Sequence, residues 1–66
     1  MTRKDYELLA EAIAYQRAAI RVLRKGKDAE SRQSELDLLV HALSWKLLED
    51  NPRFDRDRFW TATGGR

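Results

Sequence analysis

Apolar residues in the first third of the chain recur at steps of three and four, the spacing of one face of an α-helix. A first row comprises Tyr6, Leu9, Ile13, Gln16, Ile20 and Leu23, and a second row beside it comprises Leu8, Ala12, Tyr15, Ala19 and Val22. At about 100° per residue, the two rows cover roughly 200° of a helix surface. Thr2 is a suitable N-cap with Asp5 three residues later, and Gly26 suits a helix end. The pattern predicts a helix over about residues 3–25.

A second helical pattern covers about residues 28–50. One face carries Ala29, Leu36, Leu39, Val40, Leu43 and Leu47, and another carries Leu38, His41, Trp45 and Leu48. Asp28 is suited to cap its start, while Ser31 or Ser34 would cap a later start. Pro52 ends the pattern, because it lacks a backbone N–H and disfavours helical conformation at the preceding residue. Two helices of similar length joined by a short turn predict an antiparallel hairpin.

The residues after Pro52 predict a short third helix over about residues 55–62. Asp55 is a suitable N-cap, and Phe54 and Phe59 have the spacing of a hydrophobic staple. Gly64 is suited to end this helix. We expect the tail from Gly64 to Arg66 to be loose.

The length of 66 residues predicts a single domain, residues 1–66, and the helical patterns make this domain all-α. So short a domain needs a source of stability besides its own core. A domain this short buries only about 60% of the surface that its unfolded chain exposes. Disulfides and a zinc site are excluded as supports, because the chain has no cysteine and one histidine. We therefore expect two hairpins to dimerise into a four-helix bundle. The expected self-association residues are Tyr6, Leu9, Ile13, Gln16, Ile20, Leu38, His41 and Trp45.

Gln16 is the one polar member of the first row. A lone polar residue at such a position can set the register of paired helices. The alternative is that Gln16 lies at the edge of the row, where it has no such role.

Charge is distributed unevenly along the chain, although the formal net charge is only +2. Residues 1–27 carry seven Lys/Arg against three Asp/Glu, and residues 28–50 carry two against six. Arg17, Arg21, Arg24 and Lys25 form a basic stripe that would attract phosphates in a salt-dependent manner. The stripe could instead be solvated, be paired with acidic residues of the second helix, or bind an acidic protein. A small nucleic-acid-binding protein is thus one functional alternative.

The segment "NPRFDRDRFW" interleaves cations with aromatic rings. Its candidate partner-binding residues are Arg53, Phe54, Arg56, Phe59 and Trp60. Trp and Arg are enriched in interface hot spots, and rings beside cations also bind single-stranded nucleic acid. A third interpretation is a lid packed on the hairpin, in which an arginine lies over Trp60.

Asp37, His41 and Ser44 share one face of the second helix and have the residue types of a nucleophilic triad. Mid-helix N–H groups are already bonded and cannot form an oxyanion hole, so we expect no catalytic residue here. We expect His41 to lie partly buried beside Trp45 and to be hydrogen-bonded by Asp37, or to form a pH-sensitive contact. The chain also lacks a nucleotide-binding loop and a metal-ligand cluster, so neither enzyme activity nor a cofactor is expected.

The N-terminal residues carry charges that interrupt any apolar run. Neither a signal peptide nor 18 consecutive apolar residues is found, so we expect a soluble protein that does not enter a membrane. The lack of cysteine fits a reducing cytoplasm.

The opening "MTRKDYELLAEAIA" and the segment "EDNPRFDRDRF" resemble a group of small, mostly uncharacterised proteins of tailed bacteriophages and prophages of high-GC bacteria. The two stretches amount to 25 of the 66 residues, while the ending "WTATGGR" departs from the alanine-rich ending of that group. The resemblance implies a helical, phage-encoded protein in the host bacterial cytoplasm, with no catalytic residues. We expect a non-enzymatic interaction protein that self-associates and binds a host or phage protein. A purely structural, self-assembling component is a further alternative.

Overall fold

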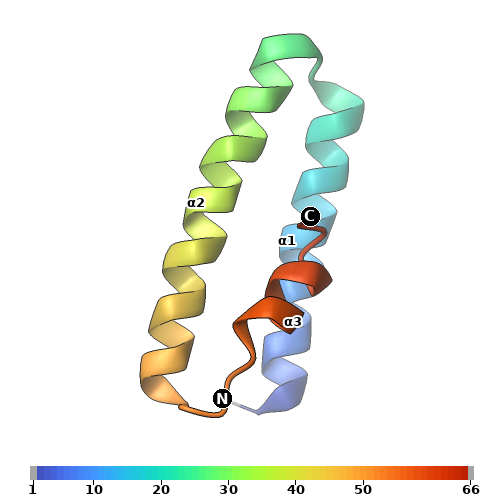
Figure 1. Ribbon diagram of the computed structural model, residues 1–66. Coiled ribbons are helices and arrows are strands. Elements are labelled where there is room, and N and C mark those ends of the chain that lie inside the picture. The colour runs from blue at the N-terminus through green and yellow to red at the C-terminus, as the bar shows by residue number, and fades with distance from the viewer. Residues whose placement is uncertain (1, 66) are drawn as a thin grey trace.

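The computed structural model describes residues 2–65, and these residues form three helices and no strand. The helices are α1 (Arg3–Leu23), α2 (Gly26–Asp50) and α3 (Arg56–Ala62). α1 and α2 form a long antiparallel hairpin, and α3 folds back onto the end of the hairpin that holds the N-terminus (Figure 1). α3 packs on both long helices. The all-α class and the three-helix order agree with the sequence prediction.

The start of α1 is capped as the sequence predicts. The N–H of Asp5 donates to Thr2 Oγ1 at 3.3 Å, and the N–H of Thr2 donates to Asp5 Oδ2 at 3.0 Å. These two bonds form a reciprocal capping box.

The turn between the long helices differs from the prediction by two residues on each side. α1 ends at Leu23 and α2 begins at Gly26, so the connection consists of Arg24 and Lys25, both in extended conformation. Gly26 has a φ of 62° but starts α2 instead of terminating α1. Asp28 consequently lies inside the first turn of α2 and does not serve as its N-cap.

α3 is held at both ends. The N–H of Arg58 donates to Asp55 Oδ1 at 3.0 Å, which confirms the predicted cap. The rings of Phe54 and Phe59 lie 5.3 Å apart and form the predicted staple. At the other end, Gly64 has a φ of 82°, and the N–H of Gly65 donates to the carbonyl of Trp60 at 3.1 Å.

This C-terminal arrangement is a Schellman motif. The expectation of a loose tail is therefore wrong for Gly64 and Gly65, which are hydrogen-bonded to α3; Arg66 lies outside the described residues.

The core lies where α3 covers the hairpin. Its buried members are Ala10, Val40, Leu47, Phe54 and Phe59, and the partly buried residues around them are Tyr6, Leu9, Ile13, Leu43, Leu48 and Trp60. Both phenylalanines follow Pro52. The C-terminal segment thus completes a core that two helices alone would leave open.

Several large apolar side chains remain outside this core. Leu8, Tyr15, Val22, Leu23, Leu38, Leu39 and Trp45 are each more than half exposed. Three of them, Leu8, Tyr15 and Val22, belong to the second row of α1. Most side chains of the first row are buried or partly buried, whereas the large side chains of the second row remain exposed to solvent.

Candidate functional site

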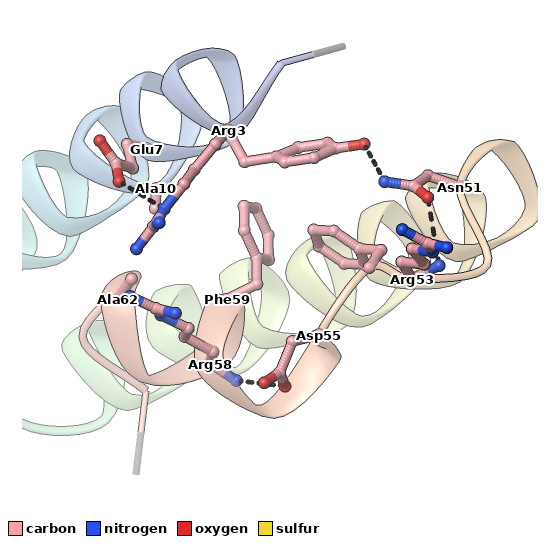
Figure 2. A pocket seen from close by; sticks show the side chains of 11 residues that line it. Arg3, Glu7, Ala10, Asn51, Arg53, Asp55, Arg58, Phe59 and Ala62 are labelled. Carbon is pink, nitrogen blue, oxygen red and sulfur yellow. Dashed lines mark hydrogen bonds and ion pairs between the residues drawn. The ribbon is translucent and has the colours of Figure 1, made fainter.

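The first turns of α1 and the C-terminal segment enclose a pocket with a volume of about 360 Å³. Its floor is a chain of three aromatic rings (Figure 2). Tyr6 and Phe54 have ring centroids 4.8 Å apart, and Phe54 and Phe59 have centroids 5.3 Å apart, with planes tilted by 57° and 58° respectively. Tilted contacts at these separations are favourable, so the floor is a packed apolar surface.

Local hydrogen bonds around Pro52 position the rings. The N–H of Phe54 donates to the carbonyl of Asn51 at 2.9 Å, and the N–H of Arg53 donates to Asn51 Oδ1 at 3.1 Å. Asn51 Nδ2 also lies 3.5 Å from the hydroxyl of Tyr6, which links this turn to α1. The turn therefore directs Phe54 inward and leaves Arg53 at the rim.

Three arginines line the pocket: Arg3, Arg53 and Arg58. Arg3 forms an exposed ion pair with Glu7, with Nε and Oε1 3.5 Å apart. Within residues 2–65, neither Arg53 nor Arg58 makes an ion pair. Arg3 and Arg58 extend toward the same edge of the pocket (Figure 2). An apolar floor with unpaired guanidinium groups at its rim suits a ligand that is partly apolar and partly anionic.

The five candidate partner-binding residues divide into two groups. Arg53, Phe54 and Phe59 line the pocket, and both phenylalanine rings are buried in its floor and do not project into solvent. Arg56 and Trp60 pack instead on the hairpin. The Arg56 guanidinium carbon lies 3.8 Å from the centroid of Trp45.

Arg17 is the most deeply buried charged residue among those described, with 4% of its surface exposed. Its Nε donates to the carbonyl of Thr63 at 2.8 Å, and its Nη1 lies 2.6 Å from Asp37 Oδ1 and 3.2 Å from Gln33 Oε1. Its guanidinium carbon also lies 5.0 Å from the ring centroid of Trp60. The predicted basic stripe needs correction at Arg17, because this side chain holds the fold together and does not face solvent.

The remaining members of the stripe, Arg21, Arg24 and Lys25, are exposed near the hairpin turn. Arg24 forms a partly exposed ion pair with Asp28, with a 3.6 Å separation. Their role in nucleic-acid binding stays a prediction.

The three residues with triad chemistry are engaged separately. Asp37 pairs with Arg17, so the expected bond from Asp37 to His41 is not formed. His41 is exposed and stacks on Trp60, with ring centroids 4.7 Å apart and planes 16° apart, and it is not buried beside Trp45. The hydroxyl of Ser44 donates to the carbonyl of Val40 at 2.7 Å. The sequence missed this arrangement because α3, which brings Trp60 to His41, is remote in the chain.

The expected self-association residues also occupy different environments. Ile20 is buried, and Tyr6, Leu9 and Ile13 are partly buried against the core. Gln16, Leu38, His41 and Trp45 are exposed. The exposed apolar surface of α1 is therefore formed mainly by the second row, and not by the first row as expected.

Neither metal-ligand geometry, helix hydropathy nor similarity to known proteins assigns a further site in the described residues. Residues 2–65 contain no group of three or more His, Cys, Asp or Glu side chains placed to hold a metal ion. None of the helices described is long and apolar enough to span a bilayer. Comparison of the chain with protein-family models, curated proteins and solved structures finds no match.

Proposed function

We propose that this chain is a non-enzymatic, phage-encoded interaction protein that self-associates and binds a host or phage protein through the pocket between α1 and the C-terminal segment. The observation that carries the proposal is the aromatic floor of Tyr6, Phe54 and Phe59 beneath Arg53 and Arg58. The resemblance of the chain ends to small phage proteins supports the origin and a location in the host cytoplasm.

The chemistry of the pocket defines the kind of partner segment that fits. Its volume lies at the lower end of the range for ligand pockets, about 300–1,000 Å³, and accommodates one or two side chains. An apolar or aromatic side chain would cover the floor, and a neighbouring Asp or Glu would pair with Arg53 or Arg58. Carboxylates form strong, often bidentate, bonds with guanidinium groups. The preferred partner is therefore an acidic protein segment with an apolar anchor.

Self-association is supported by the apolar surface that the monomer leaves exposed. Among residues 2–65, seven large apolar side chains are more than half exposed. A second hairpin packed on this surface would complete a four-helix bundle and add the burial that a short domain lacks.

A capture experiment with the full chain tests the partner hypothesis. Tagged wild type is compared with the double variant Arg53→Glu/Arg58→Glu in bacterial lysate, with and without nuclease. The matched control is Arg21→Glu/Lys27→Glu, which makes the same charge change on exposed residues near the hairpin turn.

Proteins retained by wild type and by the control, but lost from the pocket variant, would support the proposal. Captured material that is lost from the control or on nuclease treatment would contradict it and favour the nucleic-acid alternative.

A further inference from the structure

We propose that the pocket binds the C-terminal residue of its partner protein. The side chain of that residue packs on the aromatic floor, and its α-carboxylate binds the guanidinium groups of Arg3 and Arg58. This inference rests on the proposed function and deepens it, because it names the part of the partner chain that the pocket recognises. It depends on the pocket alone and not on self-association.

The pocket places an apolar surface and cationic groups within reach of one residue. Its volume of about 360 Å³ accommodates one or two side chains. The three aromatic rings form the floor, Arg3 and Arg58 extend toward one edge, and Arg53 lies at the opposite edge (Figure 2). A ligand that uses both features must therefore present an apolar group and an anion close together.

In a protein chain, the anion closest to an apolar side chain is the α-carboxylate of a C-terminal residue, because both groups are attached to the same Cα. Internal Asp and Glu side chains fit this arrangement less well. In an extended segment, successive side chains point to opposite faces, so an acidic neighbour of the apolar anchor points away from the floor. The next position on the same face lies about 7 Å farther along the chain. A C-terminal residue meets both requirements without a second side chain.

Arg3 and Arg58 can supply donors to both oxygens of a carboxylate. Within residues 2–65, the Arg58 guanidinium makes no ion pair. Arg3 is paired with Glu7 at 3.5 Å, but the two side chains are 75% and 65% exposed. An exposed pair of this kind is weak, whereas guanidinium groups bind carboxylates in strong, often bidentate, arrangements. Glu7 therefore competes with the ligand carboxylate for Arg3.

Arg53 gives the bound chain a direction. With the α-carboxylate at Arg3 and Arg58, the preceding residues extend across the floor toward Arg53. The Arg53 guanidinium makes no ion pair among the described residues, so an Asp or Glu upstream of the C-terminal residue can pair with it. The preferred ligand is thus a chain end with an apolar last residue and an acidic residue shortly before it.

NMR titration of the full chain with synthetic tetrapeptides, in about 0.15 M salt to screen distant charges, tests the inference. The probes are Ac-Gly-Ser-Gly-Phe with a free carboxylate, the same peptide as its C-terminal amide, and amidated Ac-Gly-Phe-Asp-Gly, whose carboxylate is internal. Wild type should bind the free acid at least about tenfold more tightly than either amidated peptide. The largest shifts should occur in the ring signals of Tyr6 and Phe59, which line the pocket.

Neutral substitutions at the edge of the pocket have opposite expected effects. Arg58→Gln should weaken binding of the free acid about tenfold, because the carboxylate loses one guanidinium. Glu7→Gln should tighten binding about threefold, because it removes the competitor for Arg3. Glu11→Gln is the matched control for Glu7: Glu11 lies one turn away, is exposed and makes no ion pair within residues 2–65, so its substitution should leave the affinity unchanged.

An upstream acidic residue tests the direction of the bound chain. Replacing the serine of the free-acid probe with aspartate should tighten binding to wild type about threefold. The Arg53→Gln variant should show no such gain. An equal gain in both proteins would overturn the assigned direction.

Three further outcomes would overturn the inference. They are equal affinity for the free acid and its amide, binding of the internal-aspartate probe alone, and equal tightening by Glu7→Gln and Glu11→Gln. The lysate capture with Arg53→Glu/Arg58→Glu measures the proposed function separately. A protein captured through the pocket while the free-acid probe fails to bind would uphold the proposed function and reject recognition of a C-terminal residue.

Discussion

Arg17 Nη1 lies 2.6 Å from Asp37 Oδ1, and this ion pair joins α1 to α2. The pair lies next to Thr63, the residue that follows α3. The arginine side chain is 5% exposed, whereas the aspartate side chain is 39% exposed. The carbonyl of Thr63 accepts a further bond from Arg17. One cation thus connects both long helices with the residue that follows α3.

Asp37→Ala should destabilise the protein by about 2 kcal/mol, because it leaves a buried guanidinium without its counter-charge. The partial exposure of Asp37 keeps this loss below that of a fully buried pair. Urea denaturation followed by circular dichroism measures the change. Asp28→Ala is the matched control: Asp28 also pairs with arginine, in its case with Arg24 and Arg32, but it is exposed, so its loss should stay within about 0.5 kcal/mol. Equal losses for the two variants would contradict the structural role of Arg17.

Gly65→Ala should displace the Trp60 ring, because a Cβ at Gly65 would overlap the indole. NMR should then show altered ring-current shifts for His41, which stacks on Trp60. Gly26→Ala is the control: its Cβ would meet nothing within 4 Å, although the positive φ should cost about 1 kcal/mol. His41 shifts that stay unchanged in Gly65→Ala would show that the C-terminal cap does not position Trp60.

Asp55→Ala should lower the free energy of unfolding by about 1 kcal/mol, because the N–H of Arg58 loses its cap. Asp55→Asn should remain within about 0.5 kcal/mol of wild type, since asparagine caps equally well. Thermal melting of both variants provides the comparison. A loss in the asparagine variant as large as in the alanine variant would assign the effect to charge and not to the cap.

Arg53→Glu and Arg58→Glu should each leave the free energy of unfolding within about 0.5 kcal/mol of wild type, because neither exposed side chain makes an intramolecular ion pair among the described residues. Denaturant melts check this expectation before the capture experiment. A substantial loss would mean that the rim arginines support the fold, and loss of partner binding could then not be assigned to the pocket.

Local features were predictable because their causes lie within a few residues of one another. The 3.6-residue period of apolar positions and Pro52 indicated the number, type and order of the helices. The Thr2 cap, the Asp55 cap and the staple of Phe54 and Phe59 each depend on residues three to five positions apart. The exact limits of the hairpin turn were less predictable, because Gly26 suits both the end of one helix and the start of the next.

The tertiary structure decided which side chains those helices bury, because burial depends on residues far apart in the sequence. Arg17 bonds to Asp37, 20 residues away, and to Thr63, 46 residues away, so this member of the predicted basic stripe is buried. His41 meets Trp60 only after α3 folds back. The sequence determined two apolar rows on α1, and only the packing of α2 and α3 decided which row the monomer leaves free.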